Sequence, residues 1–152
     1  MAGGASKVLP DVSASQYAAL PWRRAGGRLE ILLITTLSTK RWVVPKGWPV
    51  EGCTPSECAA QEALEEAGVV GVPTPQAIGS FSYLKRRKTG ETVPCEVAVF
   101  ALEVERQRRT WPEKAVRETC WCLVDEAVER VSDPGLKRVI ARFARKQAQE
   151  PH

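Results

Sequence analysis

Three glutamates crowd into five consecutive positions of this chain, as Glu62, Glu65 and Glu66. Residues 47–84 contain five acids and no Lys or Arg, although the formal net charge of the chain is +4. Like charges one helical turn apart repel by about 0.2–0.5 kcal/mol. Two interpretations follow from the charge pattern alone: a solvated acidic face, or carboxylates that bind a divalent cation. Oxygen ligands without His or Cys favour magnesium, or manganese, over zinc.

A well-delimited helix is predicted to carry these acids. Thr54 suits the N-cap, Pro55 the first helical position and Glu57 the third, which completes a capping box. Gly68 suits the left-handed residue just past the end. At 100° per residue the alanines and Leu64 cover an arc of about 140°, and the three glutamates occupy an adjoining arc of about 100°. The alanine face is expected to press closely onto a sheet.

The stretch from residue 47 to residue 69 resembles the Nudix box, G-x5-E-x7-R-E-U-x-E-E-x-G-U, in which U is aliphatic. The positions in register are Gly47, Glu62, Ala63, Glu65, Glu66, Gly68 and Val69. Cys53 stands where the first Glu belongs, and Gln61 stands where the Arg belongs. If these two positions lie close together, as the family layout suggests, they resemble an ion pair replaced by neutral groups, which for a buried pair can be nearly neutral for stability.

The resemblance extends over most of the chain, from about residue 16 to residue 143. The later stretch WPEKAVRETCW looks like the branch of the family that cleaves diphosphoinositol polyphosphates and diadenosine polyphosphates. The resemblance implies an α/β/α sandwich around a mixed β-sheet, with the box as a loop–helix–loop motif. It also implies a Mg²⁺-dependent pyrophosphohydrolase, with Mn²⁺ as the alternative ion, acting on a small-molecule phosphoanhydride.

Roles carry over by position. The resemblance makes Glu62 and Glu66 the principal metal ligands, and it makes Glu65 a further ligand and the catalytic base. Lys46 and Gly47 would contact phosphate through the ammonium and a backbone N–H; the alternative for Gly47 is a turn residue.

Basic residues outside the box are expected to select the substrate. Four of them form the tip of a predicted hairpin, Lys85, Arg86, Arg87 and Lys88, and Arg117 belongs to a second basic stretch. Such a concentration suits a polyphosphate, although solvated loop tips are the alternative. Trp48 is the candidate for stacking on a base. Two other functions stay open: hydrolysis of a smaller substrate, such as a nucleotide sugar or nucleoside triphosphate, and a degenerate domain that binds a phosphorylated ligand or nucleic acid without hydrolysis.

The elements that position these residues can be read from turn signals and apolar runs. Strands are expected at residues 15–24, 29–37, 42–45, 77–84, 92–103 and 118–123, with further helices at 125–130 and 135–146. The run LEILLITTL should be a central strand buried on both faces. Few helices among many strands indicate a mixed sheet covered by helices.

The composition, 43% hydrophobic and 26% charged, suits one globular domain. We expect that domain at residues 14–148, with disordered ends at 1–13 and 149–152. No apolar run is long enough for a membrane span or a secretory signal. Five cysteines without a CxxC pair suit reduced thiols and a cytoplasmic location. Nucleic acid is not an expected partner because KRRK lacks interleaved aromatic residues. The sequence leaves the oligomeric state open.

Overall fold

A computed structural model describes residues 14–150 and contains one mixed sheet of eight strands. The order along its main path is β3-β2-β1-β7-β5, with β4 paired to β1, β6 to β7 and β8 to β2. The strands are β1 (Ala14–Ala25), β2 (Arg28–Thr35), β3 (Trp42–Val43), β4 (Lys46–Gly47), β5 (Val69–Pro73), β6 (Gly79–Arg86), β7 (Thr92–Gln107) and β8 (Thr119–Leu123). The helices are α2 (Pro55–Ala67), α3 (Val124–Arg130) and α4 (Pro134–Gln149).

A tight hairpin joins β1 to β2. Gly26 and Gly27 both adopt positive φ angles, of 60° and 79°, which residues with a Cβ rarely adopt. Beyond the turn, β2 runs between β1 on one side and β3 and β8 on the other. Its four central side chains are fully buried, and successive ones enter opposite hydrophobic clusters. The prediction of a central strand buried on both faces is confirmed.

The long strand β7 is the common partner of three others. Its first half pairs antiparallel with β6, and its second half pairs antiparallel with β5. Along its opposite edge it pairs in parallel with β1, from Ala14 opposite Cys95 to Trp22 opposite Glu103. This parallel ladder makes the sheet mixed, as predicted.

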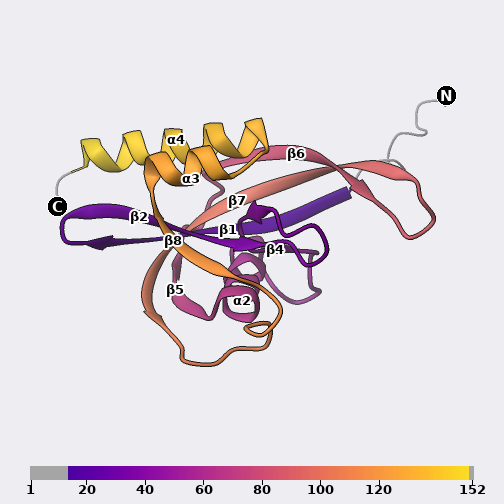
Figure 1. The fold of residues 1–152 in the computed structure, drawn as a ribbon, viewed down its shortest axis with the longest axis horizontal. Helices are drawn as coiled ribbons and strands as arrows, with labels where there is room; N and C mark the ends of the chain where they lie inside the picture. Colours follow the sequence, from indigo (N-terminus) through magenta and orange to yellow (C-terminus); the bar gives the residue numbers. More distant parts are fainter. Residues whose placement is uncertain (1–13, 151–152) are drawn as a thin grey trace.

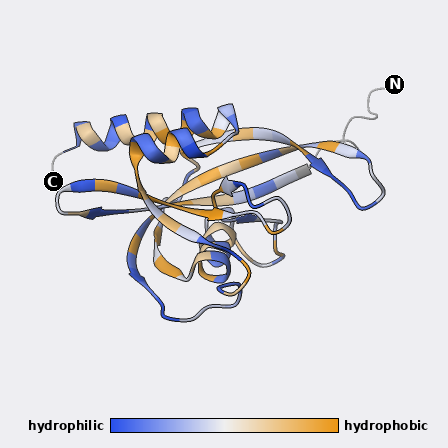
Figure 2. Cartoon of the chain, viewed as in Figure 1, coloured by the Kyte–Doolittle hydropathy of each residue, from blue (hydrophilic) through white to orange (hydrophobic). Residues whose placement is uncertain are grey.

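Helices cover both faces of the sheet, with α3 and α4 on one face and α2 on the other (Figure 1). The N-terminus of α4 is capped by Asp133, which accepts hydrogen bonds from Gly135 and Leu136. Its apolar side is buried in the larger hydrophobic cluster, and Figure 2 shows hydrophobic and hydrophilic residues alternating along this helix. The alanines of α2 pack against the other face. The predicted α/β/α sandwich is therefore confirmed.

Several boundaries differ from the sequence expectations. The strand β5 follows α2 directly and was not predicted, β7 continues to Gln107, and α4 continues to Gln149, inside the predicted tail. Residues 1–13 and 151–152, predicted to be disordered, lie outside the described part of the chain. None of the described helices has the length and apolar character needed to cross a bilayer.

Candidate active site

The helix α2 holds the glutamates in place through its two caps and its alanine face. Thr54 accepts a hydrogen bond from the backbone N–H of Glu57, whose carboxylate accepts one from the N–H of Thr54. Gly68 ends the helix in the left-handed conformation with φ 73°. Since Ala59, Ala63 and Ala67 are fully buried, the helix lies close to the sheet. Both predicted caps are confirmed, and the acids project from a rigid helix.

Glu62 and Glu66 form a hydrogen-bonded carboxyl pair on one side of α2. Glu66 is one of three buried polar residues among those described, and its side chain accepts the backbone N–H of Lys46 at 3.3 Å. Burial, followed by the hydrogen bond with Glu62, raises the pKa of Glu66 to about 8, although Arg117 opposes this shift. Burial also raises the pKa of Glu62. The pair therefore retains a proton that isolated carboxylates would lose near pH 4.5.

Gly47 makes room for this pair. It lies in β4, opposite Tyr17 of β1, and not in a turn. A Cβ on Gly47 would overlap the Glu62 carboxylate. The close approach of the strand to the carboxylate thus explains glycine at this position.

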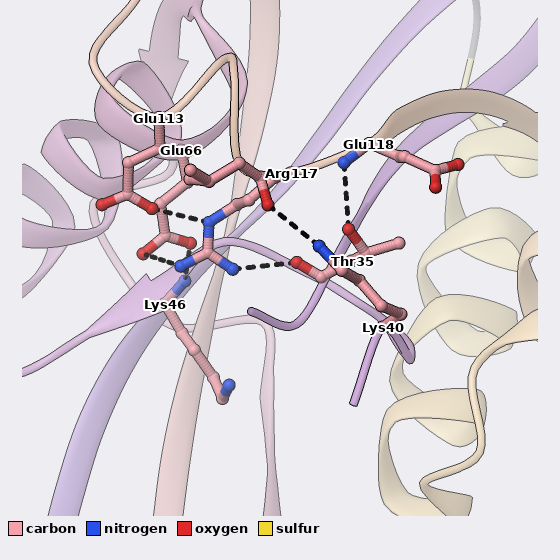
Figure 3. A network of polar contacts seen from close by, with 8 residues as sticks. Thr35, Lys40, Lys46, Glu66, Glu113, Arg117 and Glu118 are labelled. Atoms are coloured by element: carbon pink, nitrogen blue, oxygen red, sulfur yellow. Dashed lines mark hydrogen bonds and ion pairs between the residues drawn. The ribbon is translucent and has the colours of Figure 1, made fainter. Parts of the chain in front are cut away.

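Arg117 connects three segments beside the carboxyl pair. Its Nε lies 2.6 Å from Glu113 Oε1, and its Nη1 donates to the Thr35 carbonyl at 2.9 Å. Its Nη2 lies 3.7 Å from Glu66 Oε2. Figure 3 shows the guanidinium between the two glutamates on one side and Thr35 on the other. The arginine therefore belongs to the carboxylate site as well as to the cavity that it lines.

The side chain of Glu65 contacts Gln61 and not the Glu62–Glu66 pair. Its Oε2 accepts a 3.0 Å hydrogen bond from the side-chain amide of Gln61. Its backbone carbonyl accepts the N–H of Glu113, which joins the β7–β8 loop to α2. Cys53, the other departure from the box, is exposed. Gln61 is exposed as well, so the two departures do not replace a buried ion pair.

The carboxyl pair suits a hard divalent cation. Within residues 14–150 no three His, Cys, Asp or Glu side chains converge closely enough to hold a metal ion. The predicted set of ligands divides instead, with Glu62 beside Glu66 and Glu65 beside Gln61. The pair offers carboxylate oxygens, buried at Glu66 and half-buried at Glu62, and the proton it retains is the kind of positive charge that a bound cation replaces.

A cavity of about 1000 Å³ opens beside Glu66. Five bases and two acids are among its lining residues: Arg41, Lys46, Lys85, Arg86, Arg117, Glu66 and Asp133. Trp42, Phe81 and Tyr83 add aromatic surface. Burial lowers the pKa of Lys46, with Glu66 acting in the opposite sense. The cavity thus combines positive charge with apolar walls next to the carboxyl pair.

Only two of the four bases of the hairpin line the cavity. Lys85 and Arg86 line it, whereas Arg87 and Lys88 belong to the turn, which closes with a hydrogen bond from the Arg87 N–H to the Glu91 carbonyl. Figure 2 shows this hairpin tip as strongly hydrophilic. Trp48 is 45% exposed and lies outside the cavity lining, with the Lys85 ammonium 5.8 Å from its ring centre.

Sequence reasoning missed two kinds of site residue. Glu113 was not singled out, although its spacing of four from Arg117 is an ion-pair signal. The second kind lines the cavity from separate segments. There, Tyr83 donates a 2.7 Å hydrogen bond to the buried Gln16. No local pattern links residues so far apart in the chain.

Comparison with known proteins shows which family the chain belongs to. The family described as NUDIX domain matches residues 16–143. Nudix hydrolase 16, mitochondrial, of Arabidopsis thaliana is 34% identical over 116 residues, which is 74% of this chain and 64% of that protein. Nudix hydrolase 13, mitochondrial, of the same plant is 31% identical over 128 residues, which is 81% of this chain and 63% of that protein. The chain spans a little under two thirds of the length of these relatives.

Solved structures share the fold at low sequence identity. A C. elegans Ap4A hydrolase binary complex superposes with a TM-score of 0.68 at 17% identity, covering 90% of this chain and 99% of the other. The NUDIX domain of Shewanella oneidensis NrtR, complexed with ADP ribose, superposes with a TM-score of 0.67 at 14% identity, covering 95% of this chain and 96% of the other. Because the family match covers most of the chain and includes α2 with its glutamates, this protein belongs to the Nudix family.

Proposed function

We propose that this chain is a Mg²⁺-dependent hydrolase of phosphoanhydride bonds. The observation that carries the proposal is the Glu62–Glu66 pair, buried at Glu66 and half-buried at Glu62, beside a cavity with five basic lining residues. A polyphosphate carries the complementary charge, and a divalent cation would let phosphate and carboxylates approach without repulsion. The Nudix hydrolases of Arabidopsis support an enzymatic role for the family domain.

Different residues would bind the cation, bind the phosphates and accept a proton. Glu62 and Glu66 would hold the cation, which supplies charge neutralisation and a bound water of lowered pKa. Lys46 and Arg117 line the cavity and would bind phosphate oxygens. Glu65 would accept the proton of the attacking water, while the P–O bond to the leaving phosphate breaks. The hydrogen bond from the Gln61 side-chain amide orients the Glu65 carboxylate.

We favour a substrate with several consecutive phosphates, such as a diadenosine polyphosphate or an inositol pyrophosphate. Lys85 and Arg86 add two more positive charges to the cavity lining, which suits a substrate with many negative charges. The likeness to the Ap4A hydrolase fold supports this choice. The structure complexed with ADP ribose supports the alternative, a smaller nucleotide-linked diphosphate.

A substrate panel tests the proposal. Phosphate or nucleotide release is measured for diadenosine tetraphosphate, an inositol pyrophosphate, ADP ribose and a nucleoside triphosphate, each with Mg²⁺ and with a chelator. We expect Mg²⁺-dependent release that is lost in Glu66→Gln and retained in Glu96→Gln, a matched change at an exposed strand position. Tight ligand binding without turnover of any substrate would favour the non-hydrolysing alternative and overturn the proposal.

The cellular compartment stays a prediction. A cytoplasmic location is our expectation from the cysteine content, whereas both plant relatives named above carry the word mitochondrial in their names. Microscopy of the tagged full-length protein would decide between them.

A further inference from the structure

The guanidinium of Arg117 is held by contacts of unequal length. The contacts to Glu113 and to the Thr35 carbonyl are 2.6 and 2.9 Å, whereas the contact to Glu66 is 3.7 Å. The side chain is 11% exposed, so water screens these contacts only weakly. Loss of the Glu66 contact alone would leave the arginine fixed by its two shorter bonds.

Arg117 also supplies positive charge in direct contact with Glu66. Among residues 14–150, it is the sole base in ion-pair contact with Glu66. Lys46 gives Glu66 its backbone N–H, and its ammonium extends away from the network in Figure 3. The guanidinium of Arg117 lies 3.7 Å from the Glu66 carboxylate, beside the carboxyl pair. It therefore partly provides the charge that a metal ion would provide in full.

We propose that Arg117 is an internal counter-ion that competes with the divalent cation for Glu66, and that cation binding frees its Nη2 group for a substrate phosphate. The inference rests on the proposed function, because it assumes that the carboxyl pair binds a cation. Two positive charges beside one carboxylate repel each other, so each weakens the binding of the other. Because Arg117 lines the cavity, its freed Nη2 would be close to a substrate bound there.

Glu113 keeps the released arginine in position. Its carboxylate retains the Nε of Arg117, while its backbone N–H binds the Glu65 carbonyl at 3.0 Å. The β7–β8 loop thus holds the guanidinium at a fixed place relative to α2. Arg117 would exchange a carboxylate for a phosphate without a large movement, which keeps the entropic cost of substrate binding low.

A purely structural role for Arg117 predicts the opposite effect on metal affinity. If the arginine only braced Thr35 and the loop, its removal would disorder the carboxyl pair and weaken metal binding. If it competes, its removal strengthens metal binding. The sign of the change therefore separates the two roles.

The test measures Mn²⁺ binding by calorimetry, without nucleotide or turnover. We expect the Arg117→Met protein to bind Mn²⁺ about tenfold more tightly than wild type, and Arg117→Lys, which keeps the charge, to stay within about threefold. Arg41→Met is the matched control, because Arg41 lines the same cavity and its described side-chain contact is to Thr39. Its Mn²⁺ affinity should match that of wild type. Unchanged or weaker binding by folded Arg117→Met would overturn the inference.

A measurement on the wild type keeps the inference testable if Arg117→Met does not fold. The Nε–H signals of Arg117 and Arg41 are followed by ¹H–¹⁵N NMR during titration with Mg²⁺. We expect the Arg117 signal to shift as its contact with Glu66 is lost, and the Arg41 signal to stay in place. A constant Arg117 signal at saturating Mg²⁺ would overturn this inference but not the proposed function. Absence of any Mn²⁺ binding by the wild type would overturn the proposed function as well.

Discussion

The side-chain amide of Gln61 donates a 3.0 Å hydrogen bond to Glu65, one turn further along α2. The family pattern has an arginine at position 61, and an arginine can also donate to a carboxylate. Glutamine keeps this donor function without the charge. The departure at position 61 therefore preserves the orientation of Glu65, which is the residue that we propose as the base.

Removal of this amide should lower turnover. We predict that Gln61→Leu reduces kcat by about fivefold, since one hydrogen bond is worth about 1 kcal/mol. Gln61→Arg should retain activity, because it restores a donor beside Glu65. Steady-state kinetics on the best substrate of the panel measures both variants. Equal rates for Gln61→Leu and wild type would mean that the bond does not orient the base.

The stability of the metal-free protein should fall as pH rises from 5 to 8. The pKa of Glu66 is about 8 in the folded protein, against an ordinary value of 4.5. Between these values the folded state binds more protons than the unfolded state, so the free energy of unfolding decreases with pH, by at most about 1.4 kcal/mol per unit for one group. This contribution is complete below pH 4.5 and is lost as pH passes through 8. Urea denaturation in the presence of a chelator, repeated at each pH from 5 to 8, measures the free energy of unfolding of the metal-free protein.

Glutamine variants test whether Glu66 causes this pH dependence of the free energy of unfolding. Glu66→Gln should flatten the dependence and raise stability at pH 8, whereas Glu96→Gln, at an exposed position of β7, should leave it unchanged. Added Mg²⁺ should stabilise the wild type more at pH 8 than at pH 5, since the cation competes with the proton. The same slope in wild type and Glu66→Gln would remove Glu66 as its source.

The basic hairpin should act through two of its four bases. We predict that Lys85→Gln with Arg86→Gln raises KM several-fold for a substrate with four or more phosphates, and less for a diphosphate. Arg87→Gln with Lys88→Gln is the matched control, because these residues lie in the turn outside the cavity lining. The effect should shrink at high ionic strength, since exposed charges are screened. Equal KM changes for both pairs would exclude the cavity contacts as the cause.

Gly47 should tolerate a methyl group only when Glu62 is shortened. We predict that Gly47→Ala lowers the free energy of unfolding by about 1–3 kcal/mol, because the added Cβ overlaps the Glu62 carboxylate. In a Glu62→Ala background the same change should become neutral or stabilising, since Ala restricts the unfolded chain more than Gly does. A double-mutant cycle by urea denaturation measures the coupling. The same cost in both backgrounds would show that Glu62 is not the obstacle.

Local signals predicted the parts of the fold that depend on local structure. The capping box at Thr54, the left-handed Gly68 and the buried run in β2 were correct because each follows from neighbouring residues. The strand β5 was missed because it follows Gly68 without a separate turn signal and contains both Gly71 and Pro73. Its pairing with β7 stabilises it, and that contact is not visible in the segment itself.

The candidate site was predictable where the family pattern applies and not beyond it. The pattern located the three glutamates, but it did not indicate that Glu65 faces Gln61 while Glu66 faces Arg117. Side-chain directions depend on what packs beside the helix, here the β7–β8 loop. The different positions of Lys85 and Lys88 have a similar origin, because the cavity wall is formed by several separate segments.

The parallel ladder between β1 and β7 has a consequence for synthesis on the ribosome. Each β1 residue pairs with a partner about eighty positions later, so the hairpin of β1 and β2 emerges long before the strand that completes it. Until residues 95–103 have been made, one edge of β1 exposes unpaired backbone groups and its buried side chains face water. Such an edge can pair with other chains. We therefore expect nascent chains that end before β7 to associate with chaperones or to aggregate, whereas chains that extend past Gln107 do not.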